Sequence, residues 1–135
     1  HIMDHFKSEP WLGHITTFGG HPVSCAAGVA TLETLIENKA ELIDTVKAKE
    51  QLFKDNLKHP AINEIRSFGL MMAVEFDNYE INKAIIDDCI ANGILTDWFL
   101  FADNCLRIAP PLIISEEEIV QACTTIKNAI NKFCI

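Results

Sequence analysis

A mostly apolar segment at residues 70–76 constrains this chain most, because a run of that length and composition is typical of a buried β-strand. Asp77-Asn78 predicts a turn after it. Apolar side chains then recur at helical spacing, at Ile81, Ile85 and Cys89. Asn92-Gly93 predicts the end of this helix, because glycine readily adopts the left-handed conformation that terminates helices. The pattern therefore predicts a strand that leads directly into a helix.

The residues that follow predict two more strands and a last helix. Residues 94–99 and 105–109 are short and largely apolar, and Pro110-Pro111 ends the second of them. Residues 115–118 match a capping box with acidic residues in the first helical turn. Strands that flank a helix should be parallel through a right-handed crossover. The third strand returns by a short loop, antiparallel to the second, and can lie between the other two.

These elements predict an α+β fold, a split α/β sandwich with a small mixed three-stranded sheet and helices packed on one face. We expect residues 60–135 to form this domain. Residues 22–59 should be a helical connection, in which Pro22 starts one helix and Asn38 caps a second. Residues 1–21 should be an extended arm, whose first three residues are typical of an expression-tag remnant before a start methionine.

Composition narrows the classes of function. The formal net charge of -8 argues against nucleic acid or an anionic membrane as the main partner, and no segment is long and apolar enough for a membrane span. The five cysteines form no CxxC pair, which favours free thiols in a reducing compartment such as the cytoplasm. The spacing of cysteine and histidine predicts no metal site.

Three groups of residues are candidates for chemistry. The loop at 14–22, with the hydroxyls of Thr16 and Thr17, precedes a helix and could hold a phosphate, or it could simply cap the helix. Arg107 could bind a carboxylate in two-point fashion, or it could be solvated or paired with a nearby acid. The aromatic residues around Trp98 are core or an interface rather than a base-stacking surface.

Three collinear segments resemble class III aminotransferases, the pyridoxal-phosphate enzymes that act on acetylornithine, ornithine and 4-aminobutyrate. The loop HITTFGGHPVSCAA at 14–27 resembles the family's H-x-[ST]-T-[FY]-G-G-N-P segment. Residues 65–75, IRSFGLMMAVE, are similar to V-R-G-x-G-L-M-x-x-[IV]-E. Residues 106–114, LRIAPPLII, are similar to [IL]-R-[FIL]-x-P-P-L-x-[IV]. The resemblance covers residues 13–132, which correspond to the C-terminal third of such an enzyme.

The resemblance implies a role for each of two sites. Thr17, together with Thr16, would reach the phosphate of pyridoxal phosphate bound in the other subunit of a homodimer. Arg107 would bind the α-carboxylate of an amino acid or 2-oxo acid substrate. His21 stands where the family usually has asparagine, and Ile15 where it usually has glycine.

No residue here matches the family's cofactor-binding lysine or the acid that pairs with the pyridine nitrogen. Because amino-group transfer needs both groups, we expect this chain alone to be inactive. Two other functions stay open from the residues alone. One is a stand-alone ferredoxin-like regulatory domain that binds a small amino acid through Arg107. The other is an interaction domain that uses the aromatic residues near Trp98.

Overall fold

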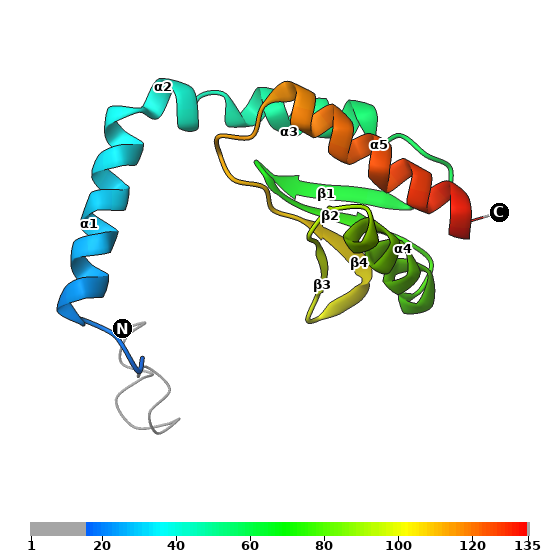
Figure 1. The fold of residues 1–135 in the computed structure, drawn as a ribbon, viewed down its shortest axis with the longest axis horizontal. Helices are drawn as coiled ribbons and strands as arrows, with labels where there is room; N and C mark the ends of the chain where they lie inside the picture. The colour runs from blue at the N-terminus through cyan, green and yellow to red at the C-terminus, as the bar shows by residue number, and fades with distance from the viewer. Residues whose placement is uncertain (1–15, 135) are drawn as a thin grey trace, which may run out of the picture. The chain divides into compact units, whose positions relative to one another are not determined.

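The computed structural model describes residues 16–134 (Figure 1). The chain divides into two compact units, His1–Asn38 and Lys39–Ile135, and each is considered by itself. The predicted tag remnant and the predicted arm up to residue 15 lie outside the described residues.

The first unit contains one long helix, α1 (Pro22–Glu37), as the sequence predicts. Pro22 occupies the first turn, where its missing N–H needs no partner. Asn38 ends the helix, since its backbone N–H and its side-chain amide both donate to the Thr34 carbonyl. No residue of α1 is buried. Large apolar side chains are exposed along it, at Val23, Val29, Leu32 and Ile36.

The prediction of a single second helix is wrong, because this segment forms two separate helices. These are the short α2 (Lys39–Leu42) and α3 (Val46–Asn56), separated by a turn. The expected N-cap at Asn38 does not form, because its side chain serves the end of α1. A polar side chain between two helical patterns can cap either one, and here the preceding helix takes it.

The second unit is built on a four-stranded sheet, where the sequence predicts three strands (Figure 1). The strands are β1 (Glu64–Phe68), β2 (Met71–Glu75), β3 (Asp97–Phe99) and β4 (Ala102–Ile108), in the order β1-β2-β4-β3. The additional strand is β1, which the sequence does not predict as a separate strand. Gly69, with φ of 62°, allows the tight turn that folds β1 back onto β2.

The predicted relation among the other three strands is confirmed. Both β2 and β3 pair antiparallel with β4, so they are parallel to each other with β4 between them. The connection from β2 to β3 passes through α4 (Tyr79–Ala91). Gly93, with φ of 86°, follows the end of α4, as the sequence predicts.

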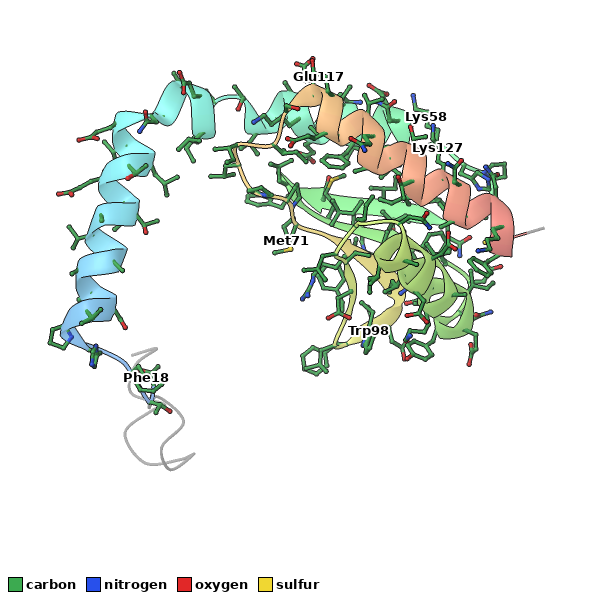
Figure 2. The ribbon with its side chains drawn as sticks, viewed as in Figure 1. Phe18, Lys58, Met71, Trp98, Glu117 and Lys127 are labelled. Carbon is green, nitrogen blue, oxygen red and sulfur yellow. The ribbon has the colours of Figure 1, made fainter. Side chains whose placement is uncertain are left out.

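One face of the sheet carries the hydrophobic core. Along β2 and β4, Met72, Val74, Leu106 and Ile108 are buried, and α3, α4 and α5 (Glu116–Phe133) supply the apolar side chains that cover them. Helices α3 and α5 run side by side (Figure 1). The alternate residues point to the uncovered face; one of them, Met71, points away from the helices in Figure 2. The α+β class and the packing of helices on one face are confirmed.

From β1 onward, the element order of the second unit is two strands, a helix, two strands and a helix, which differs from the βαββαβ order of a ferredoxin-like domain. The difference arises because β1 and β2 form a hairpin with no helix between them. The fold therefore does not support the ferredoxin-like alternative.

Hydrogen-bonding side chains begin both long helices of this unit. Asn78 accepts from the Ile81 N–H at 2.9 Å at the start of α4. At the start of α5, Ser115 Oγ accepts from the Glu118 N–H at 3.2 Å, and the Glu118 carboxylate accepts from the Ser115 N–H at 2.8 Å. The predicted capping box is confirmed.

We expect Ser115→Ala to lower the free energy of unfolding by roughly 0.5–2 kcal/mol, because the Glu118 N–H in the first turn of α5 loses its side-chain acceptor. Urea denaturation followed by far-UV circular dichroism measures the change. Thr124→Ala is the matched control, since Thr124 lies exposed within α5 and bonds only to the Val120 carbonyl of the preceding turn. Equal stability losses in the two variants would contradict the role of the cap.

Candidate functional site

The threonine loop lies directly before α1. Thr16 and Thr17 are exposed, and the turn closes with a hydrogen bond from the His21 N–H to the Phe18 carbonyl at 3.1 Å. Gly20 has φ of 76°, a conformation that favours glycine. A Cβ on Gly19 would lie 1.9 Å from Thr16 Oγ1, so glycine at this position leaves room for the hydroxyl.

The first turn of α1 suits an anion. His21 stands at the N-cap in extended conformation, its side chain makes no capping hydrogen bond, and the turn contains no acidic residue. The partial positive charge at a helix N-terminus is therefore not offset by a side chain. Two exposed hydroxyls beside such a terminus are chemically suited to phosphate oxygens.

Arg107 lies on the uncovered face of the sheet, in β4. Its neighbours along the strand, Leu106 and Ile108, point into the core, so alternation turns Arg107 outward. Its Nη2 atom lies 3.5 Å from Oδ2 of Asp97, the residue directly opposite it on β3. Thr96 Oγ1 donates to the Arg107 carbonyl at 2.6 Å, which fixes the backbone of β4 at this point.

The second arginine of the chain, Arg66, lies on the same face but has a different environment. Its Nη1 atom lies 2.5 Å from a carboxylate oxygen of Glu64 and 2.5 Å from one of Glu75. Hydrogen bonds to these two carboxylates raise the pKa of the guanidinium above its usual range, and the bond to Glu75 has the larger effect. Its Nη2 atom donates to Cys105 Sγ at 3.3 Å. Arg66 is therefore fully engaged within the sheet.

The two arginines have similar exposure, 43% for the Arg107 side chain and 46% for that of Arg66. They stand in one row across the sheet, separated by Ala73, which pairs with both. The difference between them is in hydrogen bonding. Arg66 has two short ion pairs, whereas the single ionic contact of Arg107 is long. Arg107 is thus the guanidinium with donors available to a ligand.

Arg107 also lines a pocket of about 480 Å³ formed entirely within the second unit. The loop after α4, the Pro110-Pro111 segment and one side of α5 form its other walls. Glu118 lines it as well, but its carboxylate is held by the capping box.

The aromatic group near Trp98 divides into two parts. Trp98 is half-buried and packs edge-on against Tyr79, with ring centroids 5.8 Å apart. Phe101, at the turn between β3 and β4, is 97% exposed. Trp98 therefore contributes to the core, and the hairpin tip is an apolar surface.

The structure places the predicted site residues in separate units, Thr16 and Thr17 in the first and Arg107 in the second. Sequence reasoning missed Asp97 and the Arg66 cluster. The sequence does not show the register of the strands, and Asp97 and Arg107 become neighbours only when β3 and β4 pair.

The comparisons with known proteins identify the family. Residues 1–130 match the family model described as aminotransferase class III. An acetylornithine aminotransferase from Caldanaerobacter subterraneus is 33% identical over 88% of this chain, and one from Haemophilus ducreyi is 36% identical over 88%. The chain belongs to the class III aminotransferase family.

A solved structure gives the same assignment. The ornithine aminotransferase from Toxoplasma gondii, whose description reports partial occupancy of PLP at its active site, matches 98% of this chain with a TM-score of 0.73 and 34% identity. The chain spans 31% of that protein, and 30% and 29% of the two curated relatives. The matched region is therefore about a third of a family member.

All five cysteines are free thiols, and burial raises the pKa of Cys89 and of Cys123 to about 11. Within residues 16–134, no cluster of three or more histidine, cysteine or acidic side chains could hold a metal ion. No helix in this part of the chain has the length and apolar character needed to cross a membrane.

We expect phenylglyoxal to modify Arg107 several-fold faster than Arg66, because the reagent requires a guanidinium that is not held by carboxylates. Peptide mass spectrometry over time measures both sites in one sample. Their similar exposure makes each a control for the other, and the rates should become equal in denaturant. Faster modification of Arg66 in the folded chain would contradict the assignment of Arg107 as the available guanidinium.

Proposed function

We propose that this chain is the C-terminal part of a pyridoxal-phosphate-dependent aminotransferase. The enzyme would transfer an amino group between an amino acid, of the ornithine, acetylornithine or 4-aminobutyrate type, and a 2-oxo acid. The observation that carries the proposal is the family match over residues 1–130, which includes both the threonine loop and Arg107. In the proposed organisation, residues 1–21 form an arm that carries the phosphate loop, and residues 60–135 form the small C-terminal domain. Residues 22–59 are the helical connection between them.

The threonine loop fits the phosphate end of the cofactor. Thr17 and Thr16 offer exposed hydroxyls beside an uncapped helix N-terminus, so they would hold the phosphate and fix the position of the cofactor. Pyridoxal phosphate, when bound, supplies the electron sink for amino-group transfer. No lysine lies between residues 16 and 38, so this segment does not itself offer the amine that binds the cofactor covalently.

Arg107 would orient the substrate. A guanidinium with available N–H donors binds a carboxylate through two parallel hydrogen bonds, which fixes both the position and the rotation of the ligand. Holding the carboxylate places the amino or oxo carbon of the substrate at a defined distance from the cofactor, which lowers the entropic part of the barrier. The role of Arg107 is binding and orientation, and no proton transfer is assigned to it.

We also propose that the enzyme is a homodimer of the cytoplasm. The apolar side chains of α1 are exposed in its own unit, and an exposed apolar face of this kind is suited to burial against a partner subunit. Free thiols at all five cysteines fit a reducing compartment.

We expect the 135-residue chain to retain no pyridoxal phosphate after desalting and to show no transaminase activity. Ultraviolet-visible absorbance and a coupled assay with ornithine and 2-oxoglutarate test this. Sequencing the coding region upstream provides the complementary test, since the proposal requires a cofactor-binding lysine some tens of residues before Thr17. Stoichiometric cofactor that resists desalting would contradict the proposed dependence on an upstream lysine.

In an enzyme that includes the upstream region, we expect Arg107→Ala to raise KM for the carboxylate substrate by about 10- to 100-fold, the loss typical of a charged hydrogen-bonding partner. Its cofactor absorbance should not change. Thr17→Ala should instead weaken cofactor retention and leave KM for substrate less affected. If Arg107→Ala changed cofactor retention and Thr17→Ala changed only KM, the two proposed roles would be reversed.

A further inference from the structure

The pairing of Asp97 with Arg107 is built into the strand register. The two residues are direct partners across β3 and β4, and their side chains lie on the uncovered face of the sheet. Asp97 Oδ1 accepts from the backbone N–H of Trp98 at 2.8 Å, while Oδ2 lies 3.5 Å from Arg107 Nη2. One oxygen is thus held by the backbone, and the other faces the guanidinium.

Neighbouring contacts keep this arrangement in place. Thr96, directly before β3, donates to the Arg107 carbonyl, so two consecutive residues contact the main chain and the side chain of the same arginine. Trp98 faces the opposite side of the sheet and packs on Tyr79, which anchors β3 against α4. The carboxylate of Asp97 is therefore pre-positioned beside the Arg107 guanidinium.

Asp97 is the carboxylate in direct contact with Arg107, whereas Glu118, which lines the same pocket, is held by the capping box. Glu64 and Glu75 pair with each other in the adjacent row of this face, and both are engaged by Arg66. A carboxylate bound to Arg107 would share the guanidinium with Asp97, and two like charges on one cation repel each other. A ligand that carries an ammonium group next to its carboxylate would offset this repulsion, because the ammonium is attracted to Asp97.

We propose that Asp97 is a specificity-determining residue of the Arg107 site, which weakens binding of carboxylates that lack a neighbouring positive charge and so favours zwitterionic amino acids over 2-oxo acids. This inference rests on the proposed function, in which Arg107 binds the substrate carboxylate. It adds that Asp97, the cross-strand neighbour of Arg107, determines the relative affinity for amino acids and 2-oxo acids.

The two arginines of the chain allow a direct test. The side-chain Nε–H signals of Arg66 and Arg107 can be followed by nuclear magnetic resonance in the 135-residue chain. The chain is titrated with pyruvate and with L-alanine, which share a carbon skeleton and differ in the ammonium group. Asp97→Asn removes the charge with little change of shape. Asp103→Asn, on an exposed residue of β4, is the matched control for net charge.

We expect Asp97→Asn to tighten pyruvate binding at Arg107 by about three- to tenfold, with a smaller gain for L-alanine. Asp97→Glu should retain the discrimination because it keeps the charge, and Asp103→Asn should behave as the unmodified chain. If both ligands shift Arg107 but Asp97→Asn leaves their ratio unchanged, this inference is overturned and the proposed role of Arg107 stands. If neither ligand shifts Arg107 in any variant, both are overturned.

Discussion

The burial of one face of a small sheet is the constraint on which the rest of the second unit depends. Met72, Val74, Leu106 and Ile108 point toward α3, α4 and α5, which exclude water from that side. Since side chains alternate along a strand, the intervening residues must point the other way. The uncovered face can therefore hold charged groups without the cost of burying them. Arg66, Arg107 and their acidic partners all lie there.

The two arginines on the uncovered face differ in their ionic partners, a difference that composition alone does not show. Arg66 sits between Glu64 and Glu75, and its guanidinium lies against the buried thiol of Cys105, so it is part of the sheet's own structure. Arg107 has one long contact with Asp97. A ligand carboxylate that approached Arg66 would have to displace two carboxylates, whereas at Arg107 it competes with one. The same face thus contains a structural ion cluster and a candidate binding site.

Much of the fold could be predicted from local sequence signals. Pro22, the Ser115–Glu118 capping box and Gly93 mark helix boundaries through hydrogen bonds and backbone conformations that involve only nearby residues. The sequence does not predict β1 as a separate strand, because none of its side chains is fully buried and its stability comes from pairing with β2. The predicted N-cap at Asn38 does not form, because a polar side chain between two helical patterns can cap either helix and nothing local shows which one it serves.

The sequence by itself determined the family, the types and order of most elements, and the two segments that carry Thr17 and Arg107. These properties depend on residue identity and on spacing along the chain, which can be read without coordinates. Only the tertiary structure decided which arginine is engaged and which is available, and that Asp97 faces Arg107. Those properties depend on strand register, which is fixed by packing between residues far apart in the chain. Arg107 and Asp97 are ten positions apart in sequence and direct neighbours in the sheet.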